Sequence, residues 1–302
     1  MINQLKELNQ LKEFWDDLKP YLEKEINPCI VCSDSEFSVW AQENYLRALR
    51  CDNCGMISVN PHFTEEGLNY LYSNYFRYRQ EKKLSNQQRD ETYLIDKNWV
   101  TNYIKKGKIL DIGCSGGFFL SKFLNNDFEL DGVEIGKDAA HFAKENFNIN
   151  VFEGQVTNID FPYKYDMIMM RGVIEHFKDP KSVLKKCSEI INNKGFLFIT
   201  ATPSGEDAFA FDVYREKWRL FTPLEHIHFF TVKLLTKVLE NFGFSYVASH
   251  YQYTETPYAN PEKDFNKIKE DIILINSGKY DQINNSPPFP GSMITGIWQK
   301  ID

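Results

Sequence analysis

An alternation of short apolar runs and amphipathic segments, from residue 108 onward, constrains the fold more than any other feature of the chain. The apolar runs expected to form strands are KILDIG, LDGVEI, NVFEG, YDMIMMRG, GFLFITAT, FSYVASHYQY and SMITGIWQK. Helices are expected at 118–124, 138–147, 181–191 and 262–275. Strands that alternate with helices are typical of a parallel sheet covered by helices on both faces. We therefore expect an α/β fold.

The first 26 residues carry an apolar stripe at helical spacing. Its side chains recur at steps of three or four residues, as Leu5, Leu8, Leu11, Phe14, Leu18 and Leu22. The spacing predicts an amphipathic helix that ends or kinks near Pro20. Packing of this helix on the chain's own core is the favoured interpretation, and a dimer contact is the alternative. The oligomeric state itself is not predicted.

The overall charge disfavours nucleic acid as a partner. The 302 residues carry a net charge of −7, and we find no basic stripe of the kind that binds a phosphate backbone. The N-terminus is charged throughout and no apolar run reaches the length of a membrane span, so neither a secretory signal nor membrane insertion is expected. Six cysteines without such a signal indicate a reducing compartment, and we predict a cytoplasmic protein.

Four of the cysteines form two closely spaced pairs. Cys29 and Cys32 are separated by two residues, as are Cys51 and Cys54, and 18 residues lie between the pairs. This is the spacing of a zinc ribbon, in which two tight turns present four thiolates to one ion. Four sulfur ligands leave no open position on zinc, so the predicted site is structural. Metal binding would supply most of the folding energy of so short a module.

A glycine-rich turn follows the first strand of the alternating region. The segment Asp111-Ile-Gly-Cys-Ser-Gly-Gly117 joins that strand to the next amphipathic segment. Glycines there let the backbone approach a ligand closely. Glu134 ends the next strand, 23 residues after Asp111, where a carboxylate can accept hydrogen bonds from both hydroxyls of a ribose. The pattern predicts a nucleoside-containing cofactor.

These segments resemble successive landmarks of one enzyme superfamily. DIGCSGGFFL, GVEIGKDAAHFAK, YDMIMMRGVIEHFKDP, PLEHIHFFT and the NFGF turn are similar to those of class I S-adenosylmethionine-dependent methyltransferases. The resemblance implies a Rossmann-like seven-stranded methyltransferase sheet and S-adenosylmethionine as the cofactor. Upstream, CIVC and CDNCGMISVNP resemble N-terminal zinc modules of bacterial methyltransferases that act on sugars and other secondary metabolites.

The resemblance also suggests domain boundaries. We predict an N-terminal helix over 1–26, a zinc-binding module over 27–62, a helical linker over 63–107 and a methyltransferase domain over 108–302.

Carried over onto this chain, the family's motifs assign cofactor contacts. Asp111 and Gly113 would lie beside the methionine part of the cofactor, and Glu134 would bind the ribose. Ser115 stands where many relatives have their second glycine, a small departure that leaves the loop tight if Gly116 absorbs the resulting backbone strain. The full set of implied cofactor-binding residues is Asp111, Gly113, Ser115, Gly117, Glu134, Gln155 and Val156, the last two at the adenine edge.

Methyl transfer to a hydroxyl requires alignment and a base that removes the proton. Histidine titrates near neutrality, so His226 is the first candidate and His176 the second. If the segment around His226 is extended, His228 shares its face. Arg171 ends the YDMIMMRG strand, where it either orients an anionic acceptor or is an ordinary surface arginine.

The leading hypothesis is methyl transfer to an oxygen of a sugar, nucleotide-linked sugar or polysaccharide precursor. One alternative is an RNA methyltransferase that uses the zinc ribbon to bind RNA, which the net negative charge opposes. A second alternative is a non-catalytic protein that binds the cofactor or a partner only.

Overall fold

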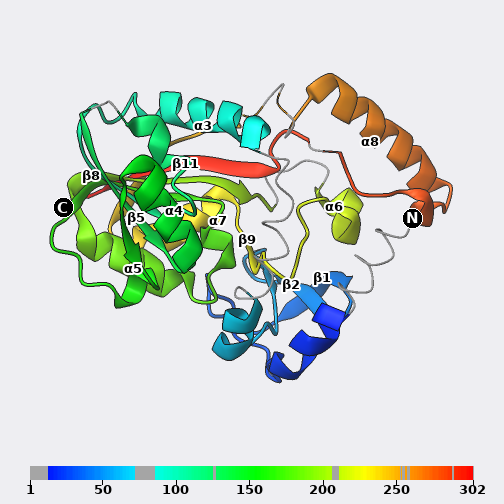
Figure 1. Ribbon diagram of the computed structural model, residues 1–302. Coiled ribbons are helices and arrows are strands. Elements are labelled where there is room, and N and C mark those ends of the chain that lie inside the picture. Colours follow the sequence, from blue (N-terminus) through cyan, green and yellow to red (C-terminus); the bar gives the residue numbers. More distant parts are fainter. Residues whose placement is uncertain are drawn as a thin grey trace.

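The computed structural model describes residues 13–71, 86–124, 127–205, 211–251, 253, 256, 259–287 and 289–301. It contains a large sheet and a small sheet, which lie next to each other (Figure 1). The large sheet consists of β4 (Gly107–Ile112), β5 (Phe128–Glu134), β6 (Asn150–Glu153), β7 (Tyr165–Arg171), β8 (Ile191–Pro203), β10 (Phe244–Ser249) and β11 (Met293–Lys300).

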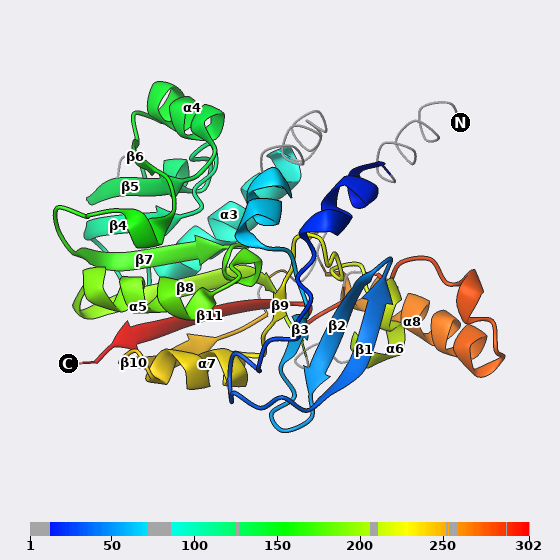
Figure 2. The same ribbon diagram turned by 90° about the horizontal axis from the view of Figure 1, so that it is seen from below.

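The large sheet has the order β10-β11-β8-β7-β4-β5-β6, which can be followed across Figure 2. Strands β4 to β8 pair in parallel, and β11 runs antiparallel to both of its neighbours. The predicted α/β fold with a seven-stranded, mostly parallel sheet is confirmed. Each predicted strand is present, with bounds that differ by a few residues.

Helices cover both faces of this sheet. The helices concerned are α3 (Asn86–Val100), α4 (Lys137–Phe147), α5 (Pro180–Ile190) and α7 (Val232–Glu240). Successive residues of a strand point to opposite faces of the sheet. Met167 belongs to the hydrophobic cluster that contains residues of α3 and α4, on one face. Ile168, the next residue, belongs to the cluster that contains residues of α5 and α7, on the other face. The central strands are therefore apolar on both faces, which explains their continuous hydrophobic runs.

Local sequence signals set where several helices begin. Asp179 accepts a hydrogen bond from the Ser182 N–H at the start of α5, and Pro180 takes the first helical position. Asn260 and Pro261 repeat this arrangement at α8 (Pro261–Asn276).

The helix expected at 118–124 is instead a short 3-10 helix, Leu120–Phe123. Gly117, with a φ of 75°, interrupts helical geometry just before it, and such short runs favour 3-10 turns.

The small sheet joins distant parts of the chain. It consists of β1 (Phe37–Glu43), β2 (Leu46–Cys51), β3 (Ile57–Val59) and β9 (His228–Phe229), in that order and antiparallel. Strand β9 comes from the region that follows β8, so the cysteine-bearing segment and the C-terminal half share one sheet. The predicted domain boundaries remain a prediction.

A second hydrophobic core lies around the small sheet. Trp40 on β1 stacks on Phe211 of α6 (Phe211–Tyr214), with ring centroids 4.2 Å apart. The described end of the N-terminal stripe also packs here, because residues 13–18 are helical and Trp15 and Leu18 are buried in this core. Leu5, Leu8 and Leu11 of the stripe lie outside the described residues, as do residues 72–85 of the predicted linker.

In the described parts of the chain, we find no helix with both the length and the apolar character that crossing a membrane requires. The remaining short helices are η1 (Lys19–Tyr21), η3 (Val156–Asn158), η4 (Ile174–His176), η5 (Arg215–Lys217) and η6 (Tyr280–Gln282).

Candidate functional site

A cavity of about 640 Å³ opens at one edge of the large sheet. The parallel strands β4, β5, β7 and β8 all end at this edge, which is where open α/β sheets bind their ligands. Side chains from the ends of these strands and from the segments that follow them line it, among them Asp111, Glu134, Arg171, Glu175, His176 and His226. The cavity therefore brings the predicted cofactor loop and both candidate histidines together.

The glycine-rich loop after β4 depends on backbone conformations that favour glycine. Gly113 has a φ of 73°, and a Cβ atom there would lie 2.7 Å from Cγ2 of Val173. Ser115 has a φ of 50°, whereas Gly116 is not among the residues with positive φ. Gly116 therefore does not absorb the backbone strain. Ser115 itself takes the left-handed conformation, so its N–H can reach Glu134.

Gly113→Ala is expected to lower the free energy of unfolding by more than the usual cost of a left-handed alanine, which is about 1–2 kcal/mol. Gly278 is the matched control for backbone strain alone, because its φ is 71° and an added Cβ would meet no atom within 4 Å. Adding Val173→Ala to Gly113→Ala should restore the part of the stability loss that exceeds the loss in Gly278→Ala. Urea denaturation of the variants checks this, and equal losses for both glycine variants would contradict a steric clash at Gly113.

Asp111 is a buried carboxylate at the floor of the cavity. It is 2% exposed, and its Oδ1 has no hydrogen-bond partner within the described chain. Burial raises the pKa of this carboxyl to about 8, Arg171 opposes the shift, and Glu134 adds to it. A buried polar atom without a partner is costly, so Asp111 fits a ligand that brings a positively charged or hydrogen-bonding group.

Glu134 is held in place by the loops around it. Its carboxylate accepts hydrogen bonds from the Ser115 N–H at 2.9 Å and from the Gly136 N–H at 2.7 Å. Burial raises the pKa of Glu134, while these two backbone hydrogen bonds lower it. Each carboxylate oxygen retains the capacity for a second hydrogen bond. The arrangement can therefore bind two further donors, as a ribose diol would supply.

Gln155 and Val156 lie in the loop that follows β6 and also line the cavity. Val156 is 3% exposed and Gln155 is exposed. Val156 thus offers an apolar surface, and Gln155 a polar group at the rim.

The two candidate histidines lie next to each other in the wall of the cavity. The ring centroids of His176 and His226 are 5.1 Å apart. The Nδ1 atom of His176 lies 2.9 Å from the carbonyl oxygen of Glu225, and that of His226 lies 2.9 Å from the carbonyl oxygen of Leu220. The Nδ1 atom of His226 also lies 2.9 Å from the Thr222 hydroxyl. A carbonyl only accepts, so these contacts favour the tautomer that carries the proton on Nδ1 and the lone pair on Nε2. Both rings can therefore act as a base or as a ligand through Nε2.

His228 does not join this pair. Only His228–Phe229 is extended, as β9, and His226 directly follows a turn over residues 223–225, so the two side chains do not share a strand face. The His228 Nδ1 lies 2.9 Å from the Ser58 hydroxyl, and burial lowers the pKa of His228 to about 4. His228 is therefore a buried residue of the small sheet, in surroundings that favour its neutral form.

Glu175 is a buried carboxyl beside the histidines. It is 1% exposed, and its Oε2 accepts a hydrogen bond from Thr202 Oγ1 at 3.0 Å. Burial raises the pKa of Glu175 to about 8, and the nearby carboxyl of Glu225 adds to the shift. Its Oε1 lies 3.9 Å from the Nε2 of His176.

Arg171 is a partly buried member of an ion pair, which the sequence did not reveal. Its Nε donates to Asp96 of α3 at 2.9 Å, and its guanidinium lies over the ring of Tyr93, 4.5 Å from the centroid. Asp96 already balances the charge of Arg171, so the suggested role in orienting an anionic acceptor stays a prediction.

Part of the cavity wall comes from before β4. Glu65, Leu68, Asn69 and Arg89 line it alongside the cofactor loop. No motif in the sequence marks these residues, because their position depends on how the N-terminal segments pack on the sheet.

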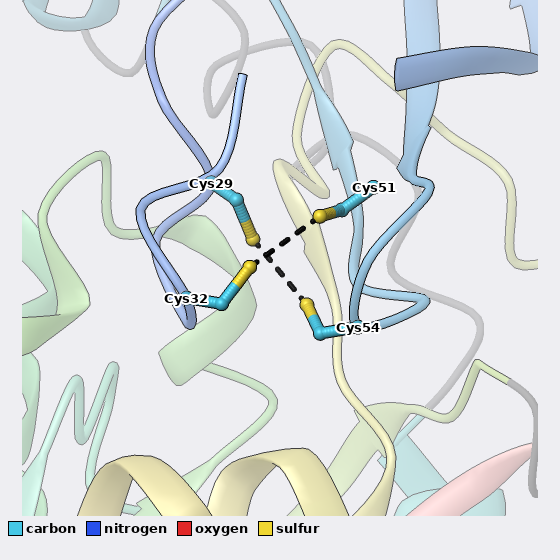
Figure 3. Close-up of side chains that lie close together, drawn as sticks. All are labelled: Cys29, Cys32, Cys51 and Cys54. Atoms are coloured by element: carbon cyan, nitrogen blue, oxygen red, sulfur yellow. Dashed lines mark hydrogen bonds between the residues drawn. The ribbon is translucent and has the colours of Figure 1, made fainter. Parts of the chain in front are cut away.

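The four paired cysteines come together in the structure (Figure 3). The Sγ atoms of Cys29 and Cys54 are 3.5 Å apart, as are those of Cys32 and Cys51, and all four lie within 4.8 Å of one another. Four sulfurs around one zinc at about 2.3 Å stand roughly 3.8 Å apart. The cluster is therefore compatible with a tetrahedral metal site, as the spacing predicted.

Comparison with known proteins places this chain in a family. A family model of the methyltransferase domain matches residues 79–249. The ubiquinone biosynthesis O-methyltransferase of Glaesserella parasuis is 30% identical over 119 residues, covering 36% of this chain and 49% of the relative. The protein of the same name from Proteus mirabilis is 25% identical over 100 residues, covering 31% and 41%. The chain thus spans about half the length of these curated relatives.

Solved structures share the fold at low sequence identity. A candidate methyltransferase from Bacillus halodurans superposes with a TM-score of 0.50 and 16% identity, covering 68% of this chain and 96% of that one. A chain from the Haloferax volcanii complex of a methyltransferase activator with a candidate methyltransferase gives a TM-score of 0.53 and 9% identity, covering 78% and 98%. The family match extends over more than half of the 302 residues, and the chain therefore belongs to the methyltransferase-domain family.

Proposed function

We propose that this protein transfers a methyl group from S-adenosylmethionine to an oxygen of a small-molecule acceptor. One observation carries the proposal: a single cavity joins the glycine-rich loop and Glu134 to the His176–His226 pair. Its volume of about 640 Å³ lies within the usual range for small-molecule sites. The names of the curated relatives, which are O-methyltransferases, support oxygen as the accepting atom.

The residues of the cavity fit the cofactor. Asp111 offers a buried, unpartnered acceptor to the ammonium group, and Gly113, Ser115 and Gly117 let the backbone approach the ligand. Glu134 would hold the ribose, with Gln155 and Val156 at the adenine edge. When bound, the cofactor supplies an electrophilic methyl group on a sulfonium. The protein holds the acceptor oxygen in line with that group and handles its proton, for which we propose His226 first and His176 second.

We propose a sugar, nucleotide-linked sugar or polysaccharide precursor as the acceptor, on the resemblance of the cysteine module to those of sugar-modifying methyltransferases. Release of S-adenosylhomocysteine over a panel of sugar nucleotides and other small hydroxyl compounds tests both the reaction and the acceptor class. Product with none of them, in protein that binds the cofactor, would count against the proposed reaction.

Glu134→Ala is expected to weaken S-adenosylhomocysteine binding at least tenfold. The substitution removes two hydrogen bonds between a charged group and the ribose, each worth about 1.5–3 kcal/mol. It also leaves the Ser115 N–H without the carboxylate to which it now donates. Isothermal titration calorimetry measures the change. Glu153→Ala, at the exposed end of β6, is the matched control and should bind normally. Unchanged affinity in Glu134→Ala would locate the ribose elsewhere.

For the cysteine cluster we propose one structural zinc ion, held by Cys29, Cys32, Cys51 and Cys54. The donor set consists of four thiols within 4.8 Å of one another, which suits a soft tetrahedral cation. With all four positions filled by protein, this ion would have no place for an acceptor or water.

A further inference from the structure

We propose that Glu175, His176 and His226 form a second metal site, which binds a divalent cation with an open coordination position for the acceptor oxygen. The inference rests on the proposed function and specifies how the histidine pair would act on the acceptor. One ligand atom from each of the three residues lies within 4.8 Å of the other two. All three residues line the cavity that also contains the cofactor loop.

The donor set is one that divalent metals use. Two imidazoles and one carboxylate hold zinc in hydrolytic enzymes and iron(II) in oxygenases, with positions left for a substrate. Ligand atoms about 2.1 Å from a shared tetrahedral zinc stand roughly 3.4 Å apart. The Nε2 of His176 lies 3.9 Å from the Oε1 of Glu175. A small rotation of these side chains would complete the site.

Each of the three side chains is already oriented by an outer hydrogen bond. The Nδ1 atoms of His176 and His226 each lie 2.9 Å from a backbone carbonyl oxygen, and Glu175 accepts from Thr202 at 3.0 Å. Metal-binding histidines are usually fixed in this way, with one ring nitrogen donating to a carbonyl and the other bound to the metal. The Nδ1 contacts of both rings match this arrangement, in which Nε2 serves as the ligand atom.

The carboxyl groups around the site favour a cation. Glu175 and Glu225 are both buried carboxyl side chains, 1% and 5% exposed, and both line the cavity. Within the described chain, no lysine or arginine forms an ion pair with Glu175. The lysine and the arginine nearest to it in sequence are engaged elsewhere, since Lys178 pairs with Glu23 at 2.5 Å and Arg171 pairs with Asp96 at 2.9 Å.

An open site of this kind sets the chemistry of the acceptor. A hydroxyl bound to a divalent cation loses its proton to water near neutral pH. The resulting oxygen attacks the methyl carbon, the C–O bond forms as the C–S bond breaks, and the bonding electron pair leaves on sulfur. Three protein ligands leave room for two acceptor oxygens on a five-coordinate ion. The site would therefore favour an acceptor with a second oxygen next to the reacting hydroxyl, such as a vicinal diol.

Zinc content tests the site without any measurement of activity. Protein equilibrated with excess Zn²⁺ and then desalted is expected to retain two equivalents per chain, one in the cysteine cluster and one here. His176→Gln and Glu175→Gln should retain one. His141→Gln is the matched control for weak zinc binding at an exposed histidine, because His141 and Glu145 form an exposed pair outside the proposed site. This variant should retain two equivalents. Equal zinc content in the wild type and both site variants would overturn the proposal.

Turnover separates this inference from the proposed function. Removing the second zinc equivalent with a mild chelator should lower the rate of methyl transfer at least tenfold. Adding Zn²⁺ or Mn²⁺ should restore the rate. Full turnover in protein that lacks the second equivalent would overturn the inference that the cation binds the acceptor oxygen and would leave the methyltransferase function intact. A bound second equivalent with no product from any acceptor would leave the site standing and refute the proposed function.

Discussion

Replacing Cys51 by serine is expected to lower the zinc content by one equivalent per chain and to lower the melting temperature by about 10 °C. Loss of a metal belongs to the small group of changes that cost about 4 kcal/mol or more, and each kcal/mol shifts the melting temperature of a chain of this size by about 2–4 °C. Atomic emission spectroscopy and calorimetry measure the two effects. Protein purified without chelator that contains no zinc would refute the structural site.

The damage should extend beyond the cysteine-bearing segment. Cys51 ends β2, which pairs with β3, and the Val59 N–H of β3 donates to the carbonyl oxygen of Ile227 at 2.8 Å. The Ile227 N–H in turn donates to the carbonyl oxygen of Glu175 at 2.8 Å. Loss of order in the small sheet would therefore reach η4, which carries Glu175 and His176. We expect lower turnover in Cys51→Ser even where the cofactor still binds.

Cys187→Ser is the matched control for this experiment. Cys187 is a fully buried thiol of α5 that lies outside the cysteine cluster. The variant loses a buried sulfur and some stability but should keep its zinc. Hydrogen exchange should then show faster exchange of β1, β2 and β3 in Cys51→Ser alone. Similar exchange in both variants would mean that the cluster does not hold the small sheet together.

The parts of the fold that were predictable are those encoded by local patterns. The strand YDMIMMRG is apolar on both faces because it lies in the middle of a covered sheet, and its sequence shows this directly. Asp179 and Pro180 mark the start of α5 within two residues. The cysteine pairs were equally legible, because the two-residue spacing within each pair forms a turn that presents both sulfurs on one side.

The features that were not predictable depend on contacts between distant residues. Strand β9 is only two residues long, and its Ser58–His228 contact with β3 spans 170 positions, so no periodic pattern marks it. The ion pair between Arg171 and Asp96 likewise joins β7 to a helix 75 positions earlier. At Ser115 the loop geometry overrode a residue preference, since a serine adopts the conformation that glycine usually takes.

In the candidate site, too, some residues could be predicted from the sequence and others could not. Asp111, Gly113 and Glu134 follow from the positions of strand ends, and the structure brings them to one cavity. Their roles in cofactor binding stay predictions until binding is measured. Glu175 was visible next to His176, but its burial and its closeness to His226 arise only from the folded chain, because η4 and the segment around His226 are far apart in the sequence.

His226→Gln is expected to lower turnover by about 10²–10⁴-fold, the usual contribution of a positioned proton acceptor. Glutamine keeps a similar length and an amide N–H that can donate to the carbonyl oxygen of Leu220, as Nδ1 now does at 2.9 Å. It lacks the ring nitrogen that either takes the acceptor's proton or binds the proposed cation. Cofactor affinity should stay within about twofold, because His226 lies on a different segment from the glycine-rich loop and Glu134.

The control variant His141→Gln, which replaces an exposed histidine on α4, should turn over at the wild-type rate. Loss of turnover in His176→Gln alone would transfer the role to His176. Near-normal rates in both single variants would mean that the acceptor needs no base and that the protein acts by alignment alone.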